Sequence, residues 1–221
     1  MVEPLHKGIY NDIVEGKTRS ELIFLAVGLI IQVLTYIFTQ DTFLSLVSGL
    51  CGVVSVVLCS QKKMSFYIFG YVQLITYVIL CFQQKLYGEI LENVFYFITM
   101  LVGFVLWIKH YEGRKNEVEM RRLRVVCNFS VAVLTTWMTF FMYYFLSKTD
   151  DTQPMMDAIT TVPAITAQTL MILRYRESWI YWLIIDVGAV GMWWNAENYC
   201  MVAQYVFWSL NCLYGWTKWS K

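Results

Sequence analysis

The sequence predicts an all-α membrane protein with eight transmembrane helices. Of its 221 residues, 58% are hydrophobic and 15% are charged, whereas about a quarter of the residues in an ordinary soluble domain are charged. Apolar stretches close to twenty residues long recur along the chain, and a helix of about twenty apolar residues crosses the hydrocarbon core of a bilayer. The net charge of +1 argues against a nucleic-acid partner and leaves the lipid bilayer as the expected surroundings.

Polar breaks divide the chain into a short lead-in and eight spans. Residues 1–20 carry mixed charges and no apolar core, so we expect a cytoplasmic N-terminal segment rather than a cleavable signal. The predicted spans are 21–39, 43–60, 65–83, 89–109, 121–147, 154–173, 178–196 and 198–219. Five tryptophans fall toward span ends, where interfacial aromatic residues collect. They are Trp107, Trp137, Trp179, Trp216 and Trp219.

The basic residues orient these spans. With the N-terminus inside, every Lys and Arg except Lys85 and Lys148 lies on the inner side of the membrane. Loops on the cytoplasmic side carry an excess of Lys and Arg, so this bias predicts that both termini are cytoplasmic. The inner connection 109–124 is charged throughout, and we expect a solvated, helical connector there.

A shift of 112 residues aligns the second half of the chain with the first half without gaps. Gly103 then meets Gly215, Trp107 meets Trp219, and conservative pairs such as Tyr67 with Trp179 add support. The triplets that this shift relates run in the same direction, as in transporters built from parallel repeats. The predicted organisation is an extra first helix (21–39), a first three-helix repeat (42–110), a linker with the fifth helix (111–153) and a second repeat (154–219).

Polar and aromatic residues at membrane depth form a candidate substrate-binding site. Polar side chains at this depth normally face a bundle interior or a wet cavity, and helical spacing places these on common faces of spans three, four, seven and eight. The candidates are Gln73, Asn93, Tyr96, Trp182, Asp186, Trp208 and Asn211. Each of them alone is also compatible with packing or interhelical hydrogen bonding. Together they suit a planar, hydroxylated, nearly neutral ligand better than a phosphate ester.

Asp186 lies in the middle of the stretch "WLIIDVGAVGMWW" without a basic neighbour. A carboxylate at mid-span costs roughly 2.5–3.5 kcal/mol even on the lenient insertion scale. It therefore accepts a hydrogen bond from a neighbouring Trp, Tyr or Thr, binds a ribosyl hydroxyl or a cationic ring, or carries a proton. The residues alone leave these roles open.

The sequence contains no enzyme, metal or cofactor motif. It lacks the HExxH, GxSxG and GxxxxGK[ST] patterns, which mark zinc proteases, serine hydrolases and phosphate-binding loops. Its six cysteines form no CxxC pair and lie in or beside apolar segments, as small buried hydrophobic residues do. An enzyme is therefore the weakest interpretation, and we expect no catalytic residues, metal ligands or cofactors.

Two segments resemble the signature segments of the PnuC family of bacterial vitamin transporters. They are "YGEILENVFYFITMLVGFVLW" at 87–107 and "NCLYGWTKW" at 211–219. Two positions depart from the pattern: Phe104 follows a glycine where the family more often has Trp, and "FITM" stands where we expect a Pro-Met pair. The resemblance covers essentially the whole chain. Relatives are assigned to nicotinamide riboside, thiamine, riboflavin or deoxynucleosides, and nicotinamide riboside is the expected substrate.

The resemblance also implies a fold, an assembly and a mechanism. The family has a core similar to the sugar-transporting SWEET proteins and forms homotrimers in the bacterial inner membrane. Transport is expected to be facilitated diffusion with alternating access, and cytoplasmic phosphorylation traps the vitamin. Trp182, Tyr96 and Trp208 would flank the ring or ribose, Gln73, Asn93 and Asn211 would bond the carboxamide and hydroxyls, and Asp186 would lie beside them. The alternatives are transport of another vitamin and a receptor of related fold that binds without transporting.

Overall fold

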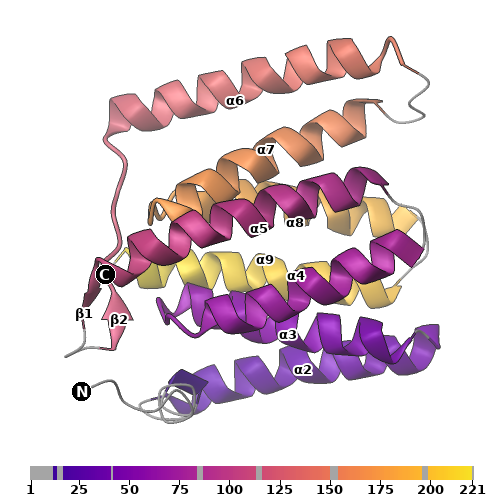
Figure 1. Cartoon of the computed structure of the whole chain (residues 1–221), viewed down its shortest axis with the longest axis vertical. Coiled ribbons are helices and arrows are strands. Elements are labelled where there is room, and N and C mark those ends of the chain that lie inside the picture. Colours follow the sequence, from indigo (N-terminus) through magenta and orange to yellow (C-terminus); the bar gives the residue numbers. More distant parts are fainter. Residues whose placement is uncertain are drawn as a thin grey trace.

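The computed structural model describes residues 12–13, 17–40, 42–83, 87–112, 116–149, 154–195 and 199–220, and most of the predicted 1–20 segment lies outside these ranges. The described part is almost entirely helical (Figure 1). Its long helices are α2 (Arg19–Thr39), α3 (Phe43–Ser60), α4 (Phe66–Gln83), α5 (Tyr87–Ile108), α6 (Val125–Leu146), α7 (Pro154–Ile172), α8 (Ser178–Asn195) and α9 (Tyr199–Trp219). Each of them coincides within a few residues with one predicted span, so the all-α prediction is confirmed.

Four of the described helices are both long and apolar enough to cross a membrane: α2, α3, α4 and α6. Shorter apolar stretches lie in α5 and α8, at Glu92–Ile108 and Ser178–Gly191. The polar residues that lower the apolar character of α7 and α9 include Gln168 and Asn211, and both side chains are buried. Such residues face the bundle interior, which is the arrangement that membrane helices require.

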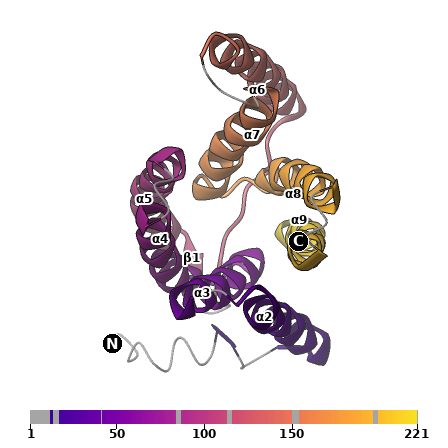
Figure 2. The ribbon, with the colours of Figure 1, turned by 90° about the vertical axis from the view of Figure 1, so that its right-hand side faces the viewer.

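Six helices form a ring that surrounds the middle of the bundle (Figure 2). In the first triplet, α3 packs on α4 and α4 on α5, and in the second, α7 packs on α8 and α8 on α9. The ring closes where α5 packs on α7 and α9 packs on α3. Outside it, α2 packs on α3 and α9, and α6 packs on α7. The ring defines an interior that the two triplets share.

The connection 109–124 is not the helical segment that the sequence predicts. It contains the short antiparallel strands β1 (Tyr111–Glu112) and β2 (Glu117–Val118). From β2 onward, N–H groups of the connection bond to carbonyls just past the ends of two helices: Val118 donates to Lys62 at 3.0 Å, and Arg121 donates to Arg174 at 2.7 Å. The connection therefore ties α3 to α7, and we call this the linker end of the bundle.

The helices α3 and α7 end in the same way at the linker end. Lys62 and Arg174 follow them in the left-handed conformation, with φ of 64° and 66°. Their N–H groups donate to Cys59 and Met171, and the next N–H groups donate to Leu58 and Leu170, which is the Schellman pattern. Residues 112 apart in the sequence thus share a strained backbone conformation and the same hydrogen bonds.

Three of the tryptophans expected at the interface are instead buried at the linker end. Trp107, Trp179 and Trp219 are at most 3% exposed. The indole of Trp107 donates to the Met171 carbonyl at 3.3 Å, and the indole of Trp219 donates to the Cys59 carbonyl at 3.2 Å. These two crossed bonds join the triplets, and the two rings meet edge to face at 5.7 Å. All three lie near helix ends, as predicted, and they pack in this shared core rather than on the outer surface of the bundle.

Gly215 is expected to be intolerant of alanine, because its Cβ would lie 2.5 Å from the Trp179 ring. Crowding of this kind in a packed core costs about 1–3 kcal/mol. Gly191 is the matched control, since nothing lies within 4 Å of its Cβ position. The midpoint of thermal unfolding in detergent should fall for Gly215→Ala and stay unchanged or rise for Gly191→Ala. Equal midpoints for both variants would contradict this packing.

Candidate functional site

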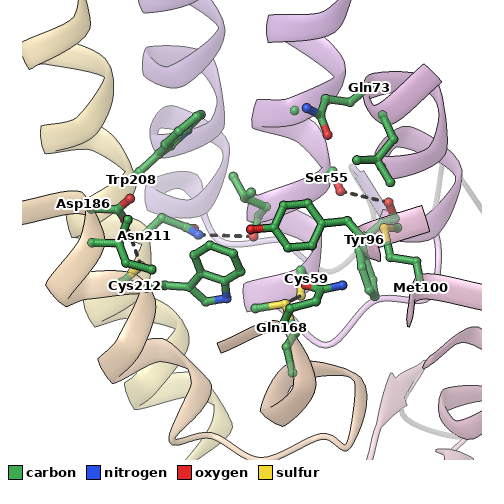
Figure 3. A pocket seen from close by; sticks show the side chains of 18 of the residues that line it. Ser55, Cys59, Gln73, Tyr96, Met100, Gln168, Asp186, Trp208, Asn211 and Cys212 are labelled. Carbon is green, nitrogen blue, oxygen red and sulfur yellow. Dashed lines mark hydrogen bonds between the residues drawn. The ribbon is translucent and has the colours of Figure 1, made fainter. Parts of the chain in front are cut away.

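A cavity of about 450 Å³ lies between the two triplets of the ring. This volume falls in the range of small-molecule sites, about 300–1,000 Å³. All seven predicted site residues line it: Gln73, Asn93, Tyr96, Trp182, Asp186, Trp208 and Asn211. In the close view, Gln73 and Tyr96 of the first triplet face Asp186, Trp208 and Asn211 of the second (Figure 3). The residues that helical spacing groups on common faces in both halves of the sequence thus line one cavity.

Two aromatic pairs of the site involve three helices. Tyr96 on α5 and Trp182 on α8 approach each other with ring centroids 6.3 Å apart and planes at 57°. On α9, Tyr205 and Trp208 meet edge to face at 5.1 Å. Both pairs line the cavity. The cavity therefore offers ring faces from both triplets, against which a flat ligand can stack.

Four buried polar atoms in the cavity wall have no hydrogen-bond partner within the described part of the chain. They are the indole nitrogens of Trp179, Trp182 and Trp208 and the hydroxyl of Tyr67. Tyr67 is 1% exposed and Trp179 is 3% exposed. Buried polar groups in proteins are nearly always hydrogen-bonded. These four donor atoms are themselves fully buried in the wall, so a ligand reaches them only after their side chains turn toward the cavity.

Asp186 is buried in the cavity wall with 5% exposure. The thiol of Cys212 on α9 donates to its Oδ2 at 3.3 Å, so within the described part of the chain its hydrogen-bond partner is a cysteine, and the other roles that the sequence left open stay predictions. A thiol is a weak donor, and it leaves most of the acceptor capacity of a carboxylate unused. Contact between Asp186 and a ligand stays a prediction.

Asn211 lines the same cavity but also joins α9 to α3. It is 2% exposed, its amide donates to the Val56 carbonyl at 3.2 Å, and its oxygen accepts from the Ser60 hydroxyl at 3.0 Å. An amide held in this way is a rigid part of the wall. Contact between Asn211 and a ligand stays a prediction.

Sequence reasoning missed Glu92, which lines the cavity from α5. The hydroxyl of Tyr96, one turn along the same helix, donates to its carboxylate. The available signal was this spacing of four residues, which places Glu92 and Tyr96 on one helix face. Tyr67 and Trp179 also line the cavity, although the sequence analysis did not count them among the candidate site residues.

Comparisons with known proteins agree with this geometry. A family model described as nicotinamide mononucleotide transporter matches residues 42–221. The nicotinamide riboside transporter PnuC of Neisseria mucosa is 31% identical over 93% of this chain and 82% of its own length. The nicotinamide riboside transporter PnuC of Haemophilus influenzae is 29% identical over 96% of this chain and 94% of its own length. The crystal structure of a vitamin B3 transporter PnuC superposes with a TM-score of 0.81 at 29% identity, covering 97% of this chain and 96% of that one. The chain therefore belongs to the nicotinamide mononucleotide transporter family, whose members are multi-pass membrane transporters and not enzymes.

Proposed function

We propose that this chain takes up nicotinamide riboside across the inner membrane of a bacterium. The observation that carries the proposal is the aromatic cavity between the two triplets, whose described wall also contains the buried donors of Tyr67, Trp179, Trp182 and Trp208. The pyridine ring of the riboside stacks on such ring faces, and its carboxamide and ribose supply the acceptor oxygens. Gln73 and Asn93 lie in the same wall and offer further polar groups to these atoms.

The riboside fits this cavity better than the phosphorylated nucleotide. The family model is named for the mononucleotide and the relatives are named for the riboside, and these two molecules differ by one phosphate. Proteins bind phosphate through Arg, Lys or helix N-termini. Among the cavity-lining residues that the structure describes, none is Lys, Arg or His. The phosphate of the nucleotide would lose its hydration and gain no positive partner.

For the mechanism, we propose facilitated diffusion by alternating access, with both termini cytoplasmic and eight membrane spans. Three features support a parallel duplication that moves in two halves: the matching packing order in the two triplets, the matching ends of α3 and α7, and the crossed tryptophan bonds. The basic residues support a cytoplasmic linker end, where phosphorylation would trap the riboside. The homotrimer stays a proposal, and α2 and α6, outside the ring, are the helices available for subunit contacts.

Uptake of labelled nicotinamide riboside into proteoliposomes tests this function. Uptake should require the protein, should not respond to an imposed pH gradient, and should be competed strongly by unlabelled riboside. Because a phosphate lacks a positive partner in the cavity, the mononucleotide should compete at least about tenfold more weakly. Thiamine, riboflavin and a deoxynucleoside are the other competitors.

The possible outcomes separate the candidate functions. Stronger competition by thiamine, riboflavin or a deoxynucleoside would identify a different substrate in the same site. Binding of riboside without uptake would favour a receptor. A response to the pH gradient that is lost in Asp186→Asn would replace facilitated diffusion with proton coupling through that carboxylate.

A further inference from the structure

The cavity contains charge of only one sign among its described residues. Two charged side chains line it, Glu92 on α5 and Asp186 on α8, and both are acidic. They belong to different triplets, and neither α5 nor α8 contains a Lys or Arg that could pair with them. The cavity is therefore electronegative where it meets both halves of the bundle.

The aromatic side chains of the cavity wall also favour a positively charged ligand. Tyr67, Tyr96, Trp179, Trp182 and Trp208 line the cavity, and the faces of such rings carry partial negative charge that attracts cations. A cation among these rings and two carboxylates is stabilised by both. A neutral molecule of the same shape keeps the stacking contacts and loses the electrostatic attraction.

The two carboxylates lie at different places along the cavity. Asp186 is 5% exposed and is contacted by the Cys212 thiol. Glu92 lies in the part of α5 farther from the linker end, one turn before Tyr96, whose hydroxyl it binds. Glu92 is thus placed to attract a ligand that enters from that end, and Asp186 is placed beside a ligand that has arrived.

We propose that Glu92 and Asp186 select a ligand that carries one positive charge, with Asp186 beside the bound cationic ring and Glu92 drawing the cation into the cavity. This rests on the proposed function, because nicotinamide riboside is a pyridinium cation. Recognition then depends on the charge of the ring as well as on its shape and hydroxyl groups.

The test compares two ligands that differ in ring charge. Nicotinamide riboside is cationic, and its 1,4-dihydro form has the same ribose and carboxamide on an uncharged ring. Titration calorimetry on the purified full-length protein should show that the cation binds more tightly by at least about tenfold. Asp186→Asn should remove most of this preference by weakening only the cation, while Asp186→Glu should keep it. Asp157→Asn, an exposed acidic position on α7 outside the cavity lining, is the matched control.

Glu92 is tested by the rate of binding. Stopped-flow tryptophan fluorescence should show slower association of the cation with Glu92→Gln, and the rate should depend less on salt than in the parent protein, because electrostatic steering is screened by ions. The association rate of the dihydro form should stay the same in both proteins.

The outcomes distinguish this inference from the function on which it rests. If the parent protein binds both ring forms equally, or if Asp186→Asn weakens both equally, Asp186 is a structural partner of Cys212 and charge selection is wrong. An unchanged association rate in Glu92→Gln overturns the steering role of Glu92. If the folded parent protein binds neither form, the proposed function itself fails.

Discussion

Trp182→Ala is expected to weaken the binding of nicotinamide riboside by well over about tenfold. The Trp182 ring faces Tyr96 at 6.3 Å between centroids and lines the cavity, so its removal takes away a stacking surface. The substitution also deletes an indole N–H that has no partner within the described chain. Titration calorimetry on purified protein measures the loss.

Trp137→Ala is the matched control for this prediction. Trp137 lies on α6, is 64% exposed and stacks on Phe141 outside the ring of helices. Its replacement removes the same side chain from the outer surface and should leave riboside affinity unchanged. Asn93→Ala, in the cavity wall, should weaken binding by a similar factor to Trp182→Ala. Unchanged affinity in both cavity variants would show that the ligand binds elsewhere.

The helices and the site could be predicted from the sequence because both leave regular patterns in it. A span needs close to twenty apolar residues, so each long helix appears as an apolar run between polar breaks. Residues three or four apart share a helix face, and this spacing was enough to place Trp182 with Asp186 and Asn93 with Tyr96. The structure shows all four in one cavity wall.

Contacts between distant segments could not be predicted in the same way. The connection 109–124 looks like a charged helix, but N–H groups of its backbone bond to the carbonyls of Lys62 and Arg174. Likewise, the sequence predicts that Asn211 is a ligand-binding amide. In the structure its oxygen also accepts from Ser60, which is 151 residues away in the sequence. A one-dimensional pattern gives the face of a helix and not the neighbour that this face meets.

Glu92 illustrates a different reason for a missed residue. It lies five residues into α5, close to a predicted span boundary, where a carboxylate is unremarkable because water or lipid headgroups solvate it. Only the three-dimensional arrangement shows that this carboxylate lines the same cavity as Asp186. Charge selection by the cavity therefore emerges from the pair, and neither residue indicates it alone.

The crossed tryptophan bonds lead to the second large prediction, which concerns closure of the linker end. The carbonyls that accept from Trp107 and Trp219 belong to Met171 and Cys59, and both of these residues also line the cavity. The tryptophans thus lie directly behind the cavity wall and bind the two triplets together there. Opening the cavity toward the linker end requires that these bonds break.

The double variant Trp107→Phe, Trp219→Phe keeps both rings and removes both N–H donors. Each hydrogen bond contributes about 0.5–1.5 kcal/mol, so the loss of two should raise the population open at the linker end by about 5- to 160-fold. Cys59 is 3% exposed and reports this opening when it is the only cysteine retained. Its modification by an impermeant thiol reagent, applied from the side of the linker end, should become faster by the same factor.

Trp179→Phe provides the control that isolates the hydrogen bonds from ring packing. Trp179 is buried in the same cluster and contacts Trp219 edge to face at 5.2 Å, but its N–H has no partner within the described chain. Its replacement changes the packing by a similar volume and removes no bond between the triplets, so labelling of Cys59 without ligand should stay slow. If labelling becomes faster by the same factor in the double variant and in Trp179→Phe, ring packing closes the linker end. If it stays slow in both, neither the two bonds nor the packing of Trp179 closes it. Faster labelling in the double variant alone assigns closure to the two crossed bonds, which act together because each triplet supplies one donor and one acceptor.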